Sequence, residues 1–201
     1  MTFITTIPPA DADGKLARLY DRVRGPDGDV DNILMAHSLR PASLEGHMAL
    51  YKNVLHHNAN QVPKWFLETI GVLVSLRNAC DYCVEHHFAG LQRLLGDDAQ
   101  AEAIRASLSA DLTATQLLGE KELAALRYAE KLTQVPATVG ESDIAALREA
   151  GWDDGEVLEI NQVAAYFAYA NRTVLGLGVA IDGETLGTSP SSDEEGDWGH
   201  R

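Results

Sequence analysis

The chain has 201 residues, and its 16 Lys and Arg against 30 Asp and Glu give a net charge of −14. A chain of this length can form one domain with a substantial core, and an apolar content of 45% excludes wholesale disorder. The acidic excess argues against nucleic acid and against an anionic membrane surface as partners. No apolar run approaches the roughly 20 residues that span a bilayer, and the first ten residues do not form a secretory signal. We therefore expect a cytoplasmic protein.

Helix-forming residues dominate the composition, since 27 Ala and 25 Leu stand against 6% aromatic residues, and no alternating apolar run marks a strand. Apolar residues recur at helical spacing in successive segments, which predicts an all-α, multihelical fold. Asn78 has an acidic residue three positions later, so we expect it to cap the helix that ends at Gly96. The other expected helical segments are 16–23, 33–39, those opened by Pro41 and Pro63, 98–107, 115–133, 142–150 and 153–179.

The last segment, residues 182–201, differs in composition from the rest of the chain. It contains six acidic residues and four Gly, with Leu186 and Trp198 as its large apolar groups, so it cannot bury much surface alone. We predict one helical domain over residues 1–181 and an acidic tail over residues 182–201. The tail is expected to be mobile or ordered against another subunit.

The two cysteines of the chain, Cys80 and Cys83, form a C-x-x-C pair. In a reducing cytosol such a pair is more often catalytic, redox-active or metal-binding than structural. On a helix, His87 lies roughly 20° from Cys80 and roughly 40° from Cys83 around the axis, so the three side chains share one face. The spacing suits a disulfide, free N–H groups at a helix start stabilise a thiolate, and His87 can accept its proton. This pattern indicates two-electron thiol chemistry.

A carboxylate on the preceding helix is the candidate group for orienting the imidazole of His87. Glu68 stands among apolar residues, so we expect it either at a helix edge or buried with a partner. Ser75, seven residues later, shares the helix face of Glu68 and could carry a proton relay.

The segment from Glu68 to His87 resembles the signature of the alkylhydroperoxidase D-like branch of the carboxymuconolactone decarboxylase-like superfamily. That signature has a Glu twelve residues before a C-x-x-C and a His four residues after the second Cys, and Glu68, Cys80, Cys83 and His87 match all four positions. The Asn-x-Cys-x-Tyr-Cys form is similar to the subgroup called peroxidase-related proteins. A softer resemblance extends over most of the chain, from residues 8–9 to residues 177–179.

The resemblance implies an all-helical, homo-oligomeric antioxidant enzyme that uses neither a metal nor another cofactor. By analogy, Cys83 is the peroxidatic thiolate, and His87 and Glu68 promote its deprotonation. The thiolate attacks an organic hydroperoxide and becomes a sulfenic acid, which Cys80 resolves to a disulfide. A dithiol donor, for which a lipoyl group is one candidate, then reduces that disulfide.

One position departs from the best-studied branch of the family, which has a second His directly before the second cysteine. This chain has Tyr82 there, and a phenol with a pKa of about 10 does not relay a proton near neutral pH. His86 is adjacent to His87 but points about 100° away around the helix. We therefore expect a shorter relay, with an activity that is weaker or directed at another substrate.

Three other interpretations of the cysteines stay open from the sequence. The pair can be two small buried apolar residues. It can bind zinc together with His87 and either His86 or Glu68, or with a contribution from the histidines at 56–57. It can also act as a redox sensor that switches the assembly of a non-catalytic scaffold.

A lactone decarboxylase, as elsewhere in the superfamily, is a further alternative, although that chemistry needs acid–base groups and no thiols. We expect His37, His47, His56 and His57 at the surface or the core edge. The aromatic residues Tyr166, Phe167 and Tyr169 are expected to belong to the core, because they recur at helical spacing.

Overall fold

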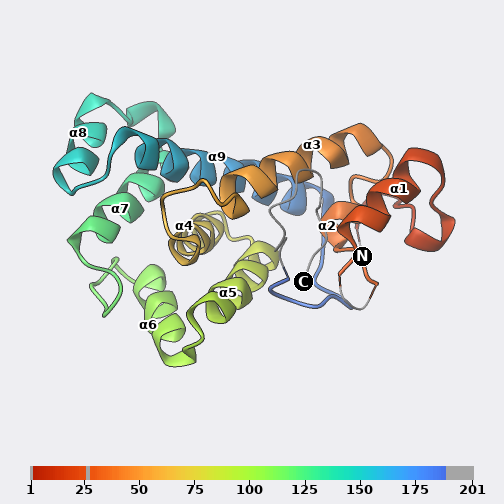
Figure 1. Cartoon of the computed structure of the whole chain (residues 1–201), viewed down its shortest axis with the longest axis horizontal. Helices are drawn as coiled ribbons and strands as arrows, with labels where there is room; N and C mark the ends of the chain where they lie inside the picture. Colours follow the sequence, from red (N-terminus) through yellow and green to blue (C-terminus); the bar gives the residue numbers. More distant parts are fainter. Residues whose placement is uncertain (1, 26–27, 189–201) are drawn as a thin grey trace.

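The computed structural model describes residues 2–25 and 28–188, and all regular elements in these ranges are helical (Figure 1). This confirms the all-α prediction. A π-helical turn, η2 (Lys52–His56), follows α3 directly, and two short 3-10 turns are η1 (Pro9–Asp11) and η3 (Pro136–Thr138). The α-helices are α1 (Gly14–Val23), α2 (Asn32–Met35), α3 (Pro41–Tyr51), α4 (Lys64–Arg77), α5 (Asp81–Leu95), α6 (Asp98–Ser109), α7 (Glu120–Gln134), α8 (Glu141–Glu149) and α9 (Asp154–Leu177).

Helix α4 lies at the centre of the molecule, with α5, α7 and α9 around it (Figure 1). Every residue from Phe66 to Ser75 is buried, because a helix that is apolar on all sides must be surrounded by other elements. At Gly71 the approach of α9 is so close that a Cβ atom would come within 2.3 Å of the Phe167 ring. The central position of α4 places the carboxylate of Glu68 in the interior.

The connection between α4 and α5 differs from the prediction that Asn78 caps α5. Asn78 instead ends α4, and α5 begins at Asp81 with Cys80 as its N-cap residue. The N–H groups of Ala79 and Cys80 donate to carbonyls in the last turn of α4, and Ala79 has φ 53°, which together form a Schellman motif. An alanine in the left-handed position hid this helix end, since glycine is its usual mark.

Other boundaries also moved. The predicted helix over 115–133 begins only at Glu120, and the apolar run over 33–39 contributes a single short helix, α2. Among the described residues, no helix is both long enough and apolar enough to cross a membrane.

Helix α9 ends at Leu177 with Gly178 as its C-cap, and the chain then turns back beside α2 and the start of α5 (blue in Figure 1). The side-chain amide of Asn32 donates to the carbonyls of Ala180 and Asp182 at 2.9 and 3.2 Å. Residues 182–188 therefore lie against their own chain, unlike the mobile or subunit-bound tail that we expected. The rest of that predicted tail, 189–201, lies outside the described residues.

Candidate active site

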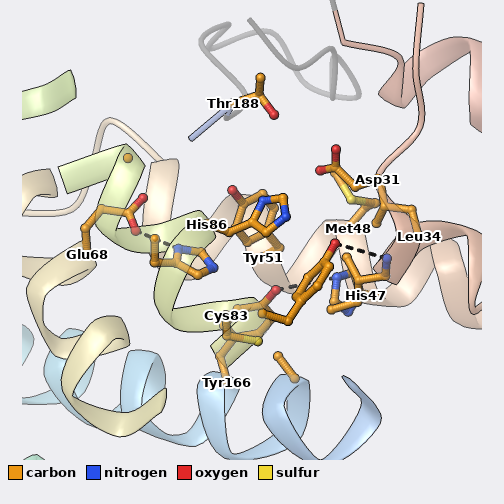
Figure 2. Close-up of a pocket in the computed structure, with 15 residues that line it drawn as sticks. Asp31, Leu34, His47, Met48, Tyr51, Glu68, Cys83, His86, Tyr166 and Thr188 are labelled. Atoms are coloured by element: carbon orange, nitrogen blue, oxygen red, sulfur yellow. Dashed lines mark hydrogen bonds and ion pairs between the residues drawn. The ribbon is translucent and has the colours of Figure 1, made fainter. Parts of the chain in front are cut away.

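A small cavity opens between α2, α3, α4, α5 and α9, and Cys83 forms part of its wall (Figure 2). Of the residues predicted for the site, Glu68, Tyr82, Cys83, His86 and His87 line this cavity. Cys80 and Ser75 are fully buried and do not line it. Five of the seven predicted site residues thus line one cavity, and Cys80 and Ser75 lie beneath its surface.

The two cysteines are free thiols at the start of α5. Both pack in a small apolar cluster with Val179, but Cys80 has no exposed surface whereas Cys83 lines the cavity. The hydrogen bond between the two thiols, with help from the Cys83 backbone N–H, lowers the pKa of Cys80. The same bond, together with burial, raises the pKa of Cys83 well above its ordinary value. The shared hydrogen bond thus favours loss of one proton from the pair and disfavours loss of the second.

His87 is held by a buried carboxylate. Its Nδ1 donates to Glu68 Oε2 at 2.6 Å, which leaves Nε2 as the ring atom that can accept a proton. Burial raises the pKa of Glu68, but the hydrogen bond and charge of His87, with His56 and Arg93 nearby, lower it overall. The other carboxylate oxygen lies 3.9 Å from His56 Nε2. Glu68 is thus buried with partners, which is one of the two situations expected for it.

Asn171 of α9 lies between Ser75 and Cys83 and bonds to both. Its side-chain amide donates to Ser75 Oγ at 3.0 Å, and its carbonyl oxygen accepts from Asn78 Nδ2 at 2.9 Å. A hydrogen bond from the same side chain lowers the pKa of Cys83 against the larger effects of Cys80 and burial. Asn171 therefore contacts both the thiol of Cys83 and the C-terminal part of α4.

Tyr82 and His86 meet a carboxylate that the sequence did not indicate. The Tyr82 hydroxyl donates to Glu184 Oε1 at 2.8 Å and accepts from the Ile33 N–H at 3.3 Å. Burial, Glu184 and Asp31 raise the pKa of Tyr82 well above 10.0, so it remains a phenol. His86 Nε2 lies 3.2 Å from Glu184 Oε2. Glu184 belongs to the segment that we predicted as a tail, which is why it was missed.

The wall opposite Glu68 is aromatic and comes from α3 and α9 (Figure 2). The His47 ring lies 5.8 Å from the Tyr166 ring and 6.5 Å from the Tyr51 ring. Burial, with Glu68 nearby, raises the pKa of Tyr51 well above its usual value. The Tyr51 side chain therefore contributes a neutral hydroxyl group to this wall. Histidine and tyrosine at helical spacing are typical of an ordinary core, so no signal in the sequence separated these residues from it.

The expectation that the scattered histidines lie at the surface or core edge was wrong for three of them. His37 and His47 are buried against Tyr169 and Tyr166 of α9, and His56 is buried beside Glu68 of α4. Of the four, only His57 is exposed. In the part of the chain that the structure describes, no three His, Cys, Asp or Glu side chains are placed to hold a metal ion together.

No protein-family model matches the sequence, and no curated protein is significantly similar to it. Several solved structures share its fold. A peroxidase-related protein with an alkylhydroperoxidase AhpD core from Ralstonia eutropha JMP134 has a TM-score of 0.74 and 23% identity, over 89% of this chain and 91% of that one. A peroxidase-related protein from Silicibacter sp. TM1040 has a TM-score of 0.73 and 25% identity, over the same shares of the two chains.

The debrominase Bmp8, solved as a Cys-to-Ala variant in complex with 2,3,4-tribromopyrrole, has a TM-score of 0.69 and 18% identity. That similarity covers 91% of this chain and 95% of the debrominase. These comparisons confirm the alkylhydroperoxidase D-like resemblance at the level of the fold.

Proposed function

We propose that this protein is a cysteine-based peroxidase that reduces hydroperoxides with Cys83 and Cys80. The observation that carries the proposal is a single cavity lined both by Cys83 and by the hydrogen-bonded His87–Glu68 pair. A second thiol, Cys80, is hydrogen-bonded to Cys83 directly behind that wall. The fold that this chain shares with peroxidase-related proteins supports the same reaction class.

The first step oxidises Cys83. His87 Nε2 takes the thiol proton, directly or through a water molecule, and the thiolate attacks the terminal oxygen of the hydroperoxide. The S–O bond forms while the O–O bond breaks, and the leaving alkoxide takes the proton back from His87 to become an alcohol. Cys83 is then a sulfenic acid, oxidised by two electrons.

The second step forms the disulfide. The Cys80 sulfur attacks the Cys83 sulfur, so that the S–S bond forms, the S–O bond breaks and water leaves. An external dithiol then reduces the disulfide by exchange, and its own sulfurs are oxidised. We extend the proposal to a dithiol reductant such as a lipoyl group and to a reducing, cytoplasmic setting.

Access and acidity favour different cysteines as the attacking group. The pKa directions favour Cys80 as the sulfur that carries the negative charge, whereas the cavity wall contains only Cys83. Attack requires contact with the O–O bond, so we give access the greater weight and assign the attack to Cys83. The lowered pKa of Cys80 suits a resolving thiol, which attacks as a thiolate.

The test is a titration of free thiols before and after one equivalent of tert-butyl hydroperoxide. We expect both thiols to disappear together in the wild-type protein. Cys80→Ser should stop at a sulfenic acid on Cys83 that dimedone traps, and Cys83→Ser should not consume the peroxide. Peroxide consumption by Cys83→Ser at the wild-type rate would overturn the assignment.

Other functions give different outcomes in the same experiment. A redox sensor predicts that oxidation changes the assembly of the protein without repeated turnover when excess dithiol is supplied. A lactone decarboxylase predicts an activity that survives when both cysteines are replaced by serine. Because a debrominase shares the fold, 2,3,4-tribromopyrrole belongs in the substrate screen, and metal analysis of the purified protein tests the zinc alternative.

A further inference from the structure

A short segment after α9, residues 182–188, passes beside the thiol cavity: Glu184 bonds to two residues of its wall and Thr188 lines it. We name this segment the C-terminal strap. The Glu184 side chain is only 5% exposed. Its carboxylate accepts hydrogen bonds from the Asn32 backbone N–H and from the Tyr82 hydroxyl, the latter at 2.8 Å, and lies 3.2 Å from His86 Nε2. One carboxylate therefore fastens the strap to both α2 and α5.

Beyond Glu184 the strap lies flat against α5. Gly187 has φ +74°, and a Cβ atom there would come within 2.8 Å of the Ala89 carbonyl carbon, so this close approach requires glycine. Thr188 then reaches the mouth of the cavity on the side of His86 and Asp31 (Figure 2). The contacts at Glu184 and Gly187 fix the course of the strap across the opening.

The strap separates two cavities of different size and character. The inner cavity, which contains Cys83, has a volume of about 40 Å³, room for about three water molecules. An outer cavity of about 200 Å³ lies on the other side of the strap, and its lining includes Asp29, Asp182 and Glu184. Both cavities share Asp31 and Thr188. Glu184 lines the outer cavity while it contacts Tyr82 and His86 of the inner one, so its side chain belongs to the partition.

Building on the proposed function, we infer that Glu184 determines the substrate choice of the site. The contacts of its carboxylate with Asn32, Tyr82 and His86 hold the strap in place, so that only small, uncharged hydroperoxides reach Cys83. Hydrogen peroxide and short alkyl hydroperoxides are examples. The inner cavity, at about 40 Å³, has no room for an aryl or long alkyl group beside the O–O bond, so we expect such hydroperoxides to react slowly while Glu184 holds the strap in place. The carboxylates around the outer cavity repel anionic oxidants, because charge of one sign in a cleft lowers the local concentration of like-charged solutes.

Alkylation of Cys83 tests this inference without any peroxide. Iodoacetamide and iodoacetate are similar in size and differ in charge, and mass spectrometry of the Cys83 peptide gives the rate with each. Glu184→Gln keeps the shape of the side chain and removes its charge, so the iodoacetate-to-iodoacetamide rate ratio should rise about threefold. Glu184→Ala opens the partition, so the ratio of N-phenylmaleimide to iodoacetamide rates should rise about tenfold.

The matched control is Glu159→Gln. Glu159 is also a carboxylate that accepts backbone N–H groups across the chain, those of Gln61 and Val62, but it lies in α9 far from the strap. It should leave both ratios at their wild-type values, and a thermal melt of each variant checks folding. Equal ratios in the wild type and both Glu184 variants would overturn the inference.

A peroxide arm separates failure of the inference from failure of the proposed function. With Glu184→Ala, thiol loss with cumene hydroperoxide should speed up about tenfold relative to thiol loss with hydrogen peroxide. An unchanged ratio of these two rates overturns the role of Glu184 while the peroxidase stands. If no hydroperoxide oxidises the wild-type thiols, both the peroxidase proposal and the inferred choice of hydroperoxide are wrong. The alkylation ratios then show whether Glu184 controls access to Cys83.

Discussion

The orientation of the His87 ring depends on Glu68, which is buried in α4 and accepts the Nδ1 hydrogen. A glutamine at this position has the same size but offers an amide that can donate to the ring as well as accept from it. Glu68→Gln should therefore remove the preference for Nε2 as the acceptor and slow oxidation of Cys83 at pH 7 by about 10- to 100-fold. Stopped-flow measurement of thiol loss checks this, and a rate within twofold of wild type would contradict it.

The same carboxylate links stability to pH. The partners of Glu68 hold its pKa below the ordinary value of 4.5 in spite of its burial, so the folded state binds fewer protons there than the unfolded state. The stabilisation is complete above pH 4.5 and is lost as the pH falls through the lower pKa of the folded state. Urea unfolding below pH 4.5 should show a steeper decline in the free energy of unfolding for wild type than for Glu68→Gln. Parallel declines would show that Glu68 carries no such linkage.

Asn171 is the residue that supplies a hydrogen bond to Cys83 from α9. Asn171→Leu removes this donor, so the pKa of Cys83 should rise further and peroxide should be consumed more slowly at pH 7. The deficit should shrink as the pH increases, because the thiolate then forms without help. Absorbance of the thiolate at 240 nm against pH measures the shift.

A matched variant separates this effect from a general loss of helix packing. Asn161→Leu removes another α9 asparagine that bonds to a neighbouring helix, in this case the Tyr128 hydroxyl of α7 at 2.7 Å. Both variants should lose about 1 to 3 kcal/mol of stability through the broken bonds. Equal thiolate titrations in the two variants would contradict a positioning role for Asn171.

At the scale of elements, the helices that end at marked residues were predicted well. Gly96 has φ +61° and ends α5 where the pattern placed it, and Pro41 opens α3. The end of α4 was missed because Ala79, rather than a glycine, occupies the left-handed position, and the π-helical turn after Tyr51 was not predicted. Side-chain periodicity does not reveal a change from one backbone hydrogen-bond register to another, so these two features required the structure.

The crossing of α4 and α9 gives a prediction at this scale. Gly71→Ala would place a methyl group 2.3 Å from the Phe167 ring, which itself lies 4.5 Å from the His87 ring. The overpacking should cost at least about 1 to 3 kcal/mol and, by shifting Phe167 against His87, should also slow thiol oxidation. Chemical unfolding and thiol-loss kinetics measure the two effects.

Gly176→Ala is the control for this crossing. Gly176 also lies in a helix, but nothing would meet its Cβ within 4 Å, so alanine there should be neutral or stabilise by up to about 1 kcal/mol. A Gly71→Ala protein as stable as Gly176→Ala would show that α9 moves away without cost.

At the scale of the whole molecule, distance along the chain decided what the sequence could reveal. Glu68, Cys80, Cys83 and His87 lie on two consecutive helices, so local spacing was enough to group them. Asn171 and Glu184 come from α9 and the segment after it, and only the packing of the complete chain brings them to α5. The tail was predicted from composition alone. Composition does not reveal that one carboxylate, that of Glu184, is buried with three partners.

A contact between the N-terminal segment and the end of α9 leads to a prediction about the oligomeric state. Phe3 is 81% exposed, yet its backbone N–H donates to the Leu177 carbonyl at 2.7 Å and its ring lies against Gly178. Leu175, also near the C-terminal end of α9, is 47% exposed. Exposed apolar side chains that gather in one place mark surfaces that other proteins cover, so we expect a homo-oligomer that uses this end of α9.

Sedimentation velocity at micromolar concentration should give a mass above the 21.8 kDa of one chain. Exchanging Phe3 for Ser together with Leu175 for Glu should shift the protein towards that single-chain mass, because a buried apolar contact is replaced by polar and charged groups. Leu158→Glu, at a similarly exposed position near the other end of α9, should leave the assembly unchanged. A wild-type protein that sediments as a single chain would contradict the prediction, and dissociation caused by Leu158→Glu alone would place the interface at the other end of α9.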